Sequence, residues 1–454
     1  MSAERGSGRF ANERVMVVGA GVAGTSAARV LVQEGARVRV GDVRPRAALD
    51  DADGLEALGV ELRAGGHDVS DLDDVTLVVI SPGVPPSADL LLWAHERELP
   101  VWGELELGAR LANAPYLAVT GTNGKTTTTG MLAACLRAAG LDAIACGNIG
   151  HPFPAAAREH HDALVVEVSS FQLTQQTSFH PRVSVLLNLA PDHLDWHRSF
   201  DEYARAKARI YANQRGDDVH VGNREDPGAA RLSSAAPCRR LWFGTGEPPD
   251  GDVGYVADRL VVRADGDADL GAVDDDLAGF RADAAAAAAA ALAFGVDPEA
   301  VRVGLASYVP ARHRGETVAQ ADGVRFIDNS KATNVHAALA ALAGVHDAVL
   351  IAGGRAKGQD LSELATRSDR VVAVVALGES ADDVVRIFQD VVPVRKAGSI
   401  EEAARTAFEL APRPGAVLLA PACASWDQFR DYAERGERFA AAAARIERDG
   451  GAHG

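Results

Sequence analysis

At residues 120–127 the chain reads TGTNGKTT. An apolar segment typical of a strand, residues 116–119, comes before it, and a segment typical of a helix, residues 130–136, follows. This order of strand, glycine loop ending in Gly-Lys-Thr and helix is typical of a site that holds a triphosphate. Backbone N–H groups and the helix N-terminus face the phosphates in such a site. The loop is shorter than the usual G-x-x-x-x-G-K-[ST] pattern, so a chance Gly-Lys-Thr turn is the alternative. We predict an ATP-binding loop.

The residue types in this loop suggest separate roles. Lys125 is suited to reach the terminal phosphates, and the hydroxyl of Thr126 is suited to bind Mg²⁺. The predicted ATP contacts are Gly121, Thr122, Asn123, Gly124, Lys125, Thr126 and Thr127.

Length and composition limit the possible functions. The 454 residues suggest about three domains, and 47% apolar and 24% charged residues are ordinary values for a globular protein. A net charge of −17 argues against nucleic acid and anionic membranes as partners. The four cysteines form no C-x-x-C pair, which argues against a zinc site or a disulfide framework. Without a signal-peptide core or an apolar run of about 18 residues, we expect a cytoplasmic monomer with no membrane span.

The first 112 residues alternate strand and helix signals. An apolar run at 15–18 leads into a G-x-G-x-x-G turn, a helical stretch and a strand that ends at Asp42. This order is typical of a Rossmann-like sheet that binds a nucleotide, with the pyrophosphate at the helix start. Asp42 lies 18 residues after Gly24, close to the spacing of a ribose-binding acid. The motif alone is a weak signal, and a turn that serves packing only is the alternative.

The rest of the chain divides into two further units. Boundaries are expected near 112–115 and 308–310, and residues 244–276 are expected to be irregular or to form edge strands. Eight consecutive alanines, residues 284–291, predict a packing helix. Further strands are predicted at 75–80, 163–168, 183–187, 348–351, 371–377 and 416–419. We predict an α/β protein with a Rossmann-like domain at 1–112, a central P-loop ATPase-type domain at 113–308 and a Rossmann-like domain at 309–454.

Polar residues interrupt the apolar strands of the central unit. Glu167 lies in a strand, where a carboxylate is costly unless it is paired or binds a metal; an exposed edge-strand glutamate is the alternative. Asp192 and His193 follow a strand end, a common place for functional side chains. Asp195 and His197 are interpreted as helix-start caps or surface residues.

Lys207 shares a helix face with Tyr203 in the helix predicted at 203–210. On residue type alone, Lys207 is interpreted as a solvated lysine.

The third unit contains three polar loops. The stretch FIDNSKATN, residues 326–334, places acid, amide, hydroxyl and lysine after an apolar strand, which favours a binding site over a turn. GGRAKG, residues 353–358, is a further glycine loop with two basic residues suited to carboxylates or phosphates. In PACASWDQF, residues 421–429, small residues let a ligand approach the backbone. Cys423 there is interpreted as a small buried residue.

These motifs together resemble those of the Mur ligases. The stretches that carry the resemblance follow the family's order over nearly the whole chain: GTNGKTT at 121–127, EVSSFQL at 167–173, DHLD at 192–195, HRGE at 313–316, SKATN at 330–334, GGR at 353–355 and PACAS at 421–425. Three of them, SSFQL, SKATN and PACAS, point to the members of the family that add D-glutamate.

The resemblance implies an ATP-dependent ligase that joins D-glutamate to UDP-N-acetylmuramoyl-L-alanine through an acyl phosphate. One domain would bind the UDP sugar, one ATP and one the amino acid. It implies catalytic roles for Lys125, His193 and Lys207, and two Mg²⁺ ions near Thr126, Glu167, His193 and Lys207. Lys207 would be carbamylated by CO₂, because an anionic carbamate can bind Mg²⁺ whereas an ammonium repels it.

The resemblance also assigns the remaining ligand contacts. The UDP substrate would meet Val22, Ala23, Asp42, Val43, Arg44, Ser81, Gly83 and Asn148. D-Glutamate would meet Lys331, Thr333, Lys357 and Ser425, and the nucleotide would also meet Arg314 and Asn329.

The chain departs from the family pattern at two places. The frequent His-Asn-x-x-Asn motif before the alanine-rich helix is replaced by residues 281–285, RADAA, so an amide contact to adenine is absent or comes from elsewhere, with Asn223 as the candidate. The frequent Asn-Asp before Ser-Lys is Asp328-Asn329 here, which leaves the ribose or metal role of that carboxylate open.

Three other functions stay open on the sequence. The first is a sister ligase that adds another amino acid, or adds glutamate to a folate. The second is a nicotinamide oxidoreductase, which the Gly124-Lys125-Thr126 loop argues against. The third is a binding protein that keeps the loops without turnover, which the two departures support.

Overall fold

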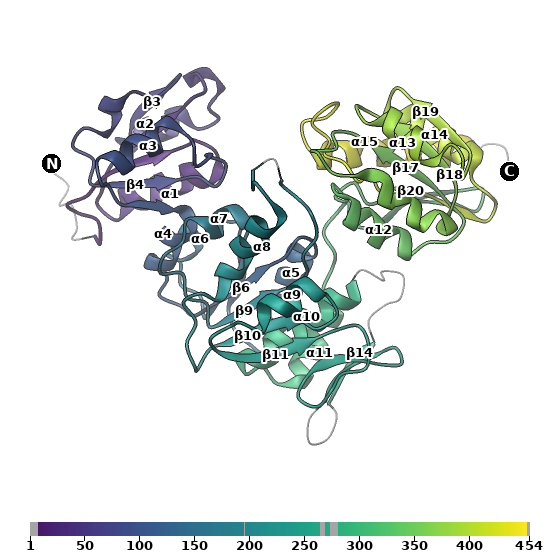
Figure 1. The fold of residues 1–454 in the computed structure, drawn as a ribbon, viewed down its shortest axis with the longest axis horizontal. Coiled ribbons are helices and arrows are strands. Elements are labelled where there is room, and N and C mark those ends of the chain that lie inside the picture. Colours follow the sequence, from purple (N-terminus) through teal and green to yellow (C-terminus); the bar gives the residue numbers. More distant parts are fainter. Residues whose placement is uncertain (1–7, 195, 264–267, 273–279, 452–454) are drawn as a thin grey trace.

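The computed structural model describes residues 8–194, 196–263, 268–272 and 280–451. Within these residues the strands form three sheets of five, nine and six strands that follow one another along the chain. Figure 1 shows the N-terminal lobe (purple) and the C-terminal lobe (green to yellow) on either side of the central lobe (teal). The predicted α/β class with three domains is confirmed, whereas the exact boundaries at 112/113 and 308/309 stay predictions.

The N-terminal sheet is parallel, in the order β3-β2-β1-β4-β5. Its elements are β1 (Arg14–Val18), α1 (Val22–Gln33), β2 (Arg37–Asp42), α2 (Ala52–Ala57), β3 (Glu61–Ala64), β4 (Leu77–Ile80), α3 (Asp89–Glu96), β5 (Val101–Gly103) and α4 (Glu104–Leu111). The strand order reverses at β1, so the crevice that binds ligands in such sheets opens at the carboxyl end of β1. The glycine-rich turn lies at this end.

The central sheet has the order β14-β13-β12-β11-β10-β9-β6-β8-β7. Its elements are β6 (Tyr116–Thr120), α5 (Lys125–Ala138), β7 (Ala143–Gly147), α6 (Phe153–Ala156), β8 (Ala163–Glu167), α7 (Ser170–Thr174), β9 (Val183–Leu186), α8 (Phe200–Ala208), β10 (Val219–Asn223), α9 (Pro227–Ser233), β11 (Arg239–Phe243), β12 (Val253–Val256), β13 (Arg259–Val262), β14 (Ala268–Ala272), α10 (Phe280–Phe294) and α11 (Pro298–Ser307). β6, which leads into the phosphate loop, lies between β8 and β9. The carboxyl ends of all three strands therefore meet at the loop.

The alanine run and the Gly-rich segment behave as predicted where they are described. Residues 284–291 lie in α10 and are fully buried against the sheet and α5, because small side chains let the helix approach both. Residues 244–276 contribute β12 to β14, with β13 and β14 antiparallel at the sheet edge. Parts of that segment, 264–267 and 273–276, lie outside the described residues.

The C-terminal sheet has the order β15-β16-β20-β17-β18-β19, with β15 antiparallel and the rest parallel. Its elements are β15 (Glu316–Ala321), β16 (Val324–Asp328), α12 (Val335–Ala343), β17 (Ala348–Gly353), the 3₁₀ segment η5 (Leu361–Arg370), β18 (Val371–Leu377), α13 (Ala381–Phe388), β19 (Val394–Ala397), α14 (Ile400–Leu410), β20 (Gly415–Leu419) and α15 (Tyr432–Gly451). The three polar loops predicted from the sequence follow the neighbouring strands β16, β20 and β17, and they meet at one edge of the sheet.

No helix in the part of the chain that the structure describes has the length and apolarity that a membrane span needs. All four cysteines are free and buried.

Candidate active site

The phosphate loop joins β6 to α5. Gly124, the residue before the helix, has φ +84°, a left-handed conformation that favours glycine. A Cβ at this position would lie 2.0 Å from Oδ1 of Asp283, so a larger residue has no room. The first turn of α5 offers the unpaired N–H groups of a helix start, which can bind an anion.

Lys125 folds back across this loop. Its Nζ donates hydrogen bonds to the carbonyl oxygens of Gly121 (2.9 Å) and Thr122 (2.8 Å). Burial lowers the pKa of Lys125, while the carboxylates of Glu167 and Asp192 act in the opposite direction. The side chain thus lies at the loop, where phosphate oxygens can replace the carbonyl oxygens as partners of the ammonium group.

Two residues without an assigned role in the sequence hold the loop in place. The side chain of Asn188 accepts from the N–H of Asn123 (2.9 Å) and donates to its carbonyl (3.2 Å). The hydroxyl groups of Tyr203 and Thr122 form a hydrogen bond of 2.9 Å. The loop backbone is therefore fixed before a nucleotide binds, which reduces the entropy lost on binding.

Glu167 lies at the carboxyl end of β8, beside the loop, and is buried. Its Oε2 accepts from the hydroxyl of Thr126 (2.7 Å), and its Oε1 accepts from Nδ2 of Asn148 (2.8 Å). The alternative of an exposed edge-strand glutamate is wrong, because β8 lies inside the sheet and the carboxylate is buried and hydrogen-bonded. Thr126 and Glu167, two of the predicted metal ligands, are thus in direct contact.

Lys207 is 2% exposed, so the interpretation as a solvated lysine is wrong. Its Nζ donates to the carbonyl of Gly121 (2.7 Å), and it lies 4.6 Å from the ring centroid of Tyr203, on the same face of α8. Burial, together with the charge of Lys125, lowers the pKa of Lys207 well below its usual value. This shift favours the neutral amine over the ammonium form.

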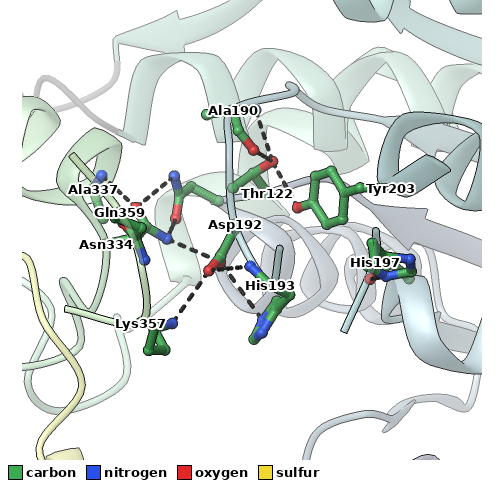
Figure 2. Close-up of polar contacts among 12 residues, drawn as sticks. Thr122, Ala190, Asp192, His193, His197, Tyr203, Asn334, Ala337, Lys357 and Gln359 are labelled. Carbon is green, nitrogen blue, oxygen red and sulfur yellow. Dashed lines mark hydrogen bonds and ion pairs between the residues drawn. The ribbon is translucent and has the colours of Figure 1, made fainter. Parts of the chain in front are cut away.

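His193 and Asp192 lie between the central and C-terminal lobes, as Figure 2 shows. Asp192 forms an ion pair with Lys357 (3.2 Å) and accepts a hydrogen bond from Asn334 (3.4 Å). His193 has φ +53°, its Nε2 lies 3.6 Å from Asp192 Oδ2, and its ring packs on Phe171. Burial lowers the pKa of His193, so the neutral imidazole, the form that binds metals, is favoured.

His197 is buried at 1% exposed and shares a 3.0 Å hydrogen bond with the hydroxyl of Ser170. The expectation of a surface residue or cap is therefore wrong, because the side chain packs on Phe171 and Tyr203, and the cap of α8 is Ser199. Asp195, the other expected cap, lies outside the described residues.

The predicted UDP-substrate residues gather at the carboxyl ends of β1, β2 and β4, with one exception. Asp42 accepts from Arg44 and from the N–H of Ala20 (2.8 Å), and Arg44 lowers the pKa of Asp42 to about 2 despite burial. Ser81 donates to the carbonyl of Gly19 (3.1 Å). The others here are Val22, Ala23, Val43 and Gly83, of which the two valines are 77% and 70% exposed. The exception, Asn148, lies on the central lobe beside Glu167.

Five of the predicted D-glutamate and nucleotide residues of the third domain lie on the loops after β16, β17 and β20: Asn329, Lys331, Thr333, Lys357 and Ser425. The sixth, Arg314, lies in the loop between α11 and β15. The Nζ of Lys331 is 3.7 Å from the ring centroid of Tyr432, and burial lowers the pKa of Lys331 to about 8. The positive charges of Arg314 and Lys331 act on Lys125. These residues of the third domain therefore lie within electrostatic range of the phosphate loop.

Arg435 on α15 is a further residue that the sequence does not single out. It is 1% exposed and donates to the hydroxyl of Ser330 (2.9 Å), the carbonyl of Ser330 (2.8 Å) and the carbonyl of Cys423 (3.1 Å). It ties the loop after β16 to the loop after β20. Its contacts with Ser330 span 105 residues, so no local signal could have found them.

Asn223, the candidate adenine contact, lies at the end of β10. Its Nδ2 donates to the carbonyl of Leu187 (2.8 Å), and β9 separates β10 from the strand of the phosphate loop. The structure thus places Asn223 apart from the group around Lys125.

Family models match most of the chain. They are described as "Mur ligase MurD-like, N-terminal domain" over residues 13–103, "Mur ligase middle domain" over 119–261 and "Mur ligase, glutamate ligase domain" over 313–423. The order and position of the three matches follow the three sheets.

Similar proteins cover the chain almost completely. The UDP-N-acetylmuramoylalanine–D-glutamate ligase of Frankia casuarinae is 45% identical over 94% of this chain and 93% of its own. The enzyme of that name in Streptomyces coelicolor is 41% identical over 95% and 98%. Among solved structures, UDP-N-acetylmuramate-alanine ligase of Thermotoga maritima matches with a TM-score of 0.61 and 18% identity. The match covers 96% of this chain and 100% of that one, which shows the shared fold. With relatives more than 40% identical over almost their whole length, the chain belongs to the Mur ligase family.

Proposed function

We propose that this chain is the ligase that joins D-glutamate to UDP-N-acetylmuramoyl-L-alanine with ATP, in the synthesis of peptidoglycan precursors. The observation that carries this function is the convergence of the lysines Lys125 and Lys207 on the carbonyl of Gly121, beside the Thr126–Glu167 contact. A phosphate loop, a buried amine and a buried carboxylate thus lie together at the carboxyl ends of neighbouring strands. The names of the full-length relatives supply the substrates.

The three domains divide the substrates between them. We assign the UDP sugar to residues 1–112, ATP to residues 113–308 and D-glutamate to residues 309–454. The crevice at β1, the phosphate loop after β6 and the loops after β16, β17 and β20 are the supporting features.

The residues around the phosphate loop suit Mg²⁺, which prefers oxygen ligands. A threonine hydroxyl and a buried carboxylate lie in contact there, although no set of three His, Cys, Asp or Glu side chains grouped for a metal occurs among the described residues. Thr126, Glu167 and His193, with Lys207 as its carbamate, would hold the two expected ions. When bound, Mg²⁺ would neutralise the charge that builds up on the phosphates.

Lys207 is suited to carbamylation because CO₂ reacts with the neutral amine. Burial and the neighbouring charge of Lys125 lower the pKa of Lys207, which favours that form. The carbamate would carry a negative charge close to Lys125 and so would also relieve the repulsion between two ammonium groups.

The reaction proceeds in two transfers. A carboxylate oxygen of the alanyl substrate takes the γ-phosphoryl group of ATP, and ADP leaves. The amine of D-glutamate then attacks the acyl-phosphate carbonyl, and phosphate leaves as the amide forms. Lys125 and the N–H groups of α5 hold the phosphates, while Lys331, Thr333, Lys357 and Ser425 would hold the glutamate. Contact between the central and C-terminal lobes would keep water from the acyl phosphate.

The cytoplasm is the compartment we propose for this reaction. The four free, buried cysteines support it, because thiols stay reduced in that compartment.

Incubation of the purified chain with ATP, Mg²⁺, UDP-N-acetylmuramoyl-L-alanine and each glutamate enantiomer tests the function. We expect phosphate release and the amide product with D-glutamate only. A coupled assay measures the phosphate, and mass spectrometry detects the amide. Turnover with another amino acid or a folate would instead identify a sister ligase. Quenching of NADH fluorescence without ligation would identify an oxidoreductase, and ATP binding without turnover would identify a binding protein.

A further inference from the structure

Asp283 is a buried acid that the ligase reaction described above does not use. It lies in the first turn of α10, directly before the eight fully buried alanines, and is 8% exposed. A carboxyl group in such surroundings is costly unless a neighbour or a proton compensates its charge. Asp283 therefore needs a neighbouring group that compensates the charge of its carboxylate, or a proton.

The partner is the phosphate loop. Oδ1 of Asp283 occupies the space that a side chain at position 124 would need, since a Cβ on Gly124 would lie 2.0 Å from it. The hydroxyl of Thr128 donates to the same oxygen at 3.3 Å, and the N–H of Thr128 donates to the carbonyl of Gly124 (2.9 Å). The carboxyl group thus packs against the first turn of α5, on which the phosphates of ATP are expected to bind.

Two cationic groups and a tyrosine face Asp283. Lys125 on α5 and Arg314 in the loop after α11 are cationic and favour its ionised form, and Tyr308 at the end of α11 also lies within electrostatic range. Burial has the larger effect and raises the pKa of Asp283 to about 7. Near neutral pH, protonated and ionised forms therefore coexist in the protein without nucleotide.

A bound triphosphate changes this balance. Its negative charges lie next to the same turn of α5 and repel a carboxylate, but they do not repel a neutral carboxyl group. A neutral carboxyl group keeps an oxygen that accepts from Thr128 and adds an O–H donor.

We propose that Asp283 is a positioning residue for the phosphate loop and that its ionised form takes up a proton from solvent when ATP binds. This inference rests on the proposed function, because it requires that ATP occupies the loop. It also gives the RADAA stretch, in which the family's amides are missing, a role in nucleotide binding.

The direction of the pH dependence follows from linkage. If ATP binds the protonated form better, then ATP affinity is highest below pH 7 and falls as the pH rises above it. The limiting fall is about tenfold per pH unit for one linked proton. Other groups near the nucleotide also titrate, Lys125 and Lys331 among them, so the comparison must be made between proteins that differ only at position 283.

The experiment measures the dissociation constant of Mg²⁺-ATP by calorimetry between pH 6 and 9 for the full chain and for Asp283→Asn. An amide keeps the acceptor and a donor but has no charge, so Asp283→Asn should keep the affinity of the parent protein at pH 6. Above pH 7 its affinity should fall less steeply, by up to about tenfold per pH unit. Asp217→Asn, an exposed acid in the same domain, serves as the control and should follow the parent protein.

A second measurement counts the protons directly. Binding heats at pH 8 in two buffers of different ionisation enthalpy give the number of protons taken up, and the parent protein should take up more protons than Asp283→Asn. Equal pH slopes and equal proton uptake in the two proteins would overturn the role of Asp283 while leaving ATP binding intact. Absence of ATP binding by the parent protein at every pH would overturn the ATP site and this inference together.

Discussion

Two lysine side chains share one acceptor, the carbonyl oxygen of Gly121. Lys125 and Lys207 donate to it from 2.9 and 2.7 Å; Lys207 is buried and Lys125 is partly buried. Two ammonium groups at such a short separation repel each other by about 4 kcal/mol at 4 Å and an effective dielectric of 20. Burial and the charge of Lys125 lower the pKa of Lys207, and proton loss from Lys207 would remove this repulsion.

Replacement of Lys125 by alanine should abolish ATP-dependent turnover without loss of the fold. The variant loses the cation that faces the phosphates, and the loss of one such group lowers the rate by about 10²–10³-fold. Phosphate release measures the effect, and circular dichroism and the melting temperature check the fold. Lys396→Ala, on the exposed surface of the third domain, is the matched control. Full activity of Lys125→Ala would remove this loop from the mechanism.

Replacement of Lys207 by alanine should also abolish activity, but in a way that a small molecule can repair. The shortened side chain leaves room beside Gly121 and Tyr203, where acetate or propionate can supply the carboxylate that the carbamate would provide. We expect a loss of about 10²-fold or more, as for other groups that support a metal site, and partial recovery with added carboxylate. Mass spectrometry of the parent protein at high bicarbonate should detect the carbamate. Unchanged activity of Lys207→Ala without additive contradicts the role.

Strands and helices could be predicted from the sequence wherever the apolar runs were long. The strand predicted at 371–377 is β18, and the alanine run lies in α10. Strands such as β3 (ELRA) and β19 (VRKA) were missed because they lie at sheet edges and carry charged, partly exposed residues without a continuous apolar run. The contact between Glu167 and Thr126 spans 41 residues, so the sequence could suggest each residue as functional but could not show the pair.

Arg435 on α15 holds together the loop after β16 and the loop after β20. In Arg435→Lys the charge remains, but the planar fork that reaches Ser330 and Cys423 together is lost. Loss of one hydrogen bond from a charged group corresponds to about 1.5–3 kcal/mol, so we expect the KM for D-glutamate to rise about tenfold or more. The KM for ATP should stay close to that of the parent protein, because the phosphate loop lies on another domain. An equal rise in both constants would indicate general unfolding of the third domain instead.

The arrangement of the whole molecule depends on contacts that local sequence cannot show. Length and motif order predicted three domains, and each motif could be placed at a strand end. The amide groups of Asn123 and Asn334, however, exchange hydrogen bonds of 3.3 and 3.0 Å across 211 residues, and Asp192 reaches Lys357 over 165 residues. These contacts join the phosphate loop directly to the third domain. Nothing in the residue types alone predicts such pairs, because asparagine and aspartate suit turns and caps equally well.

Substitution of Asn334 should therefore loosen the contact between the central and C-terminal lobes. Asn334 also caps α12 by accepting from Ala337, and serine preserves that cap while it removes the amide that reaches Asn123 and Asp192. Loss of the reciprocal hydrogen bonds corresponds to about 1 kcal/mol, or about a fivefold shift toward separated lobes.

The distance between the two lobes can be measured directly. Spin labels on Arg231→Cys and Glu363→Cys report it, and the native cysteines are buried and should not react. In the protein without nucleotide, Asn334→Ser should widen the distance distribution, and saturating ATP with UDP-N-acetylmuramoyl-L-alanine should narrow it again because the ligands add contacts between the same lobes. A distribution identical to that of the parent protein would mean that the remaining contacts, the Lys357–Asp192 ion pair and the Asn123–His336 hydrogen bond, hold the lobes without Asn334. Asp192→Asn in the same labelled protein would then have to widen it.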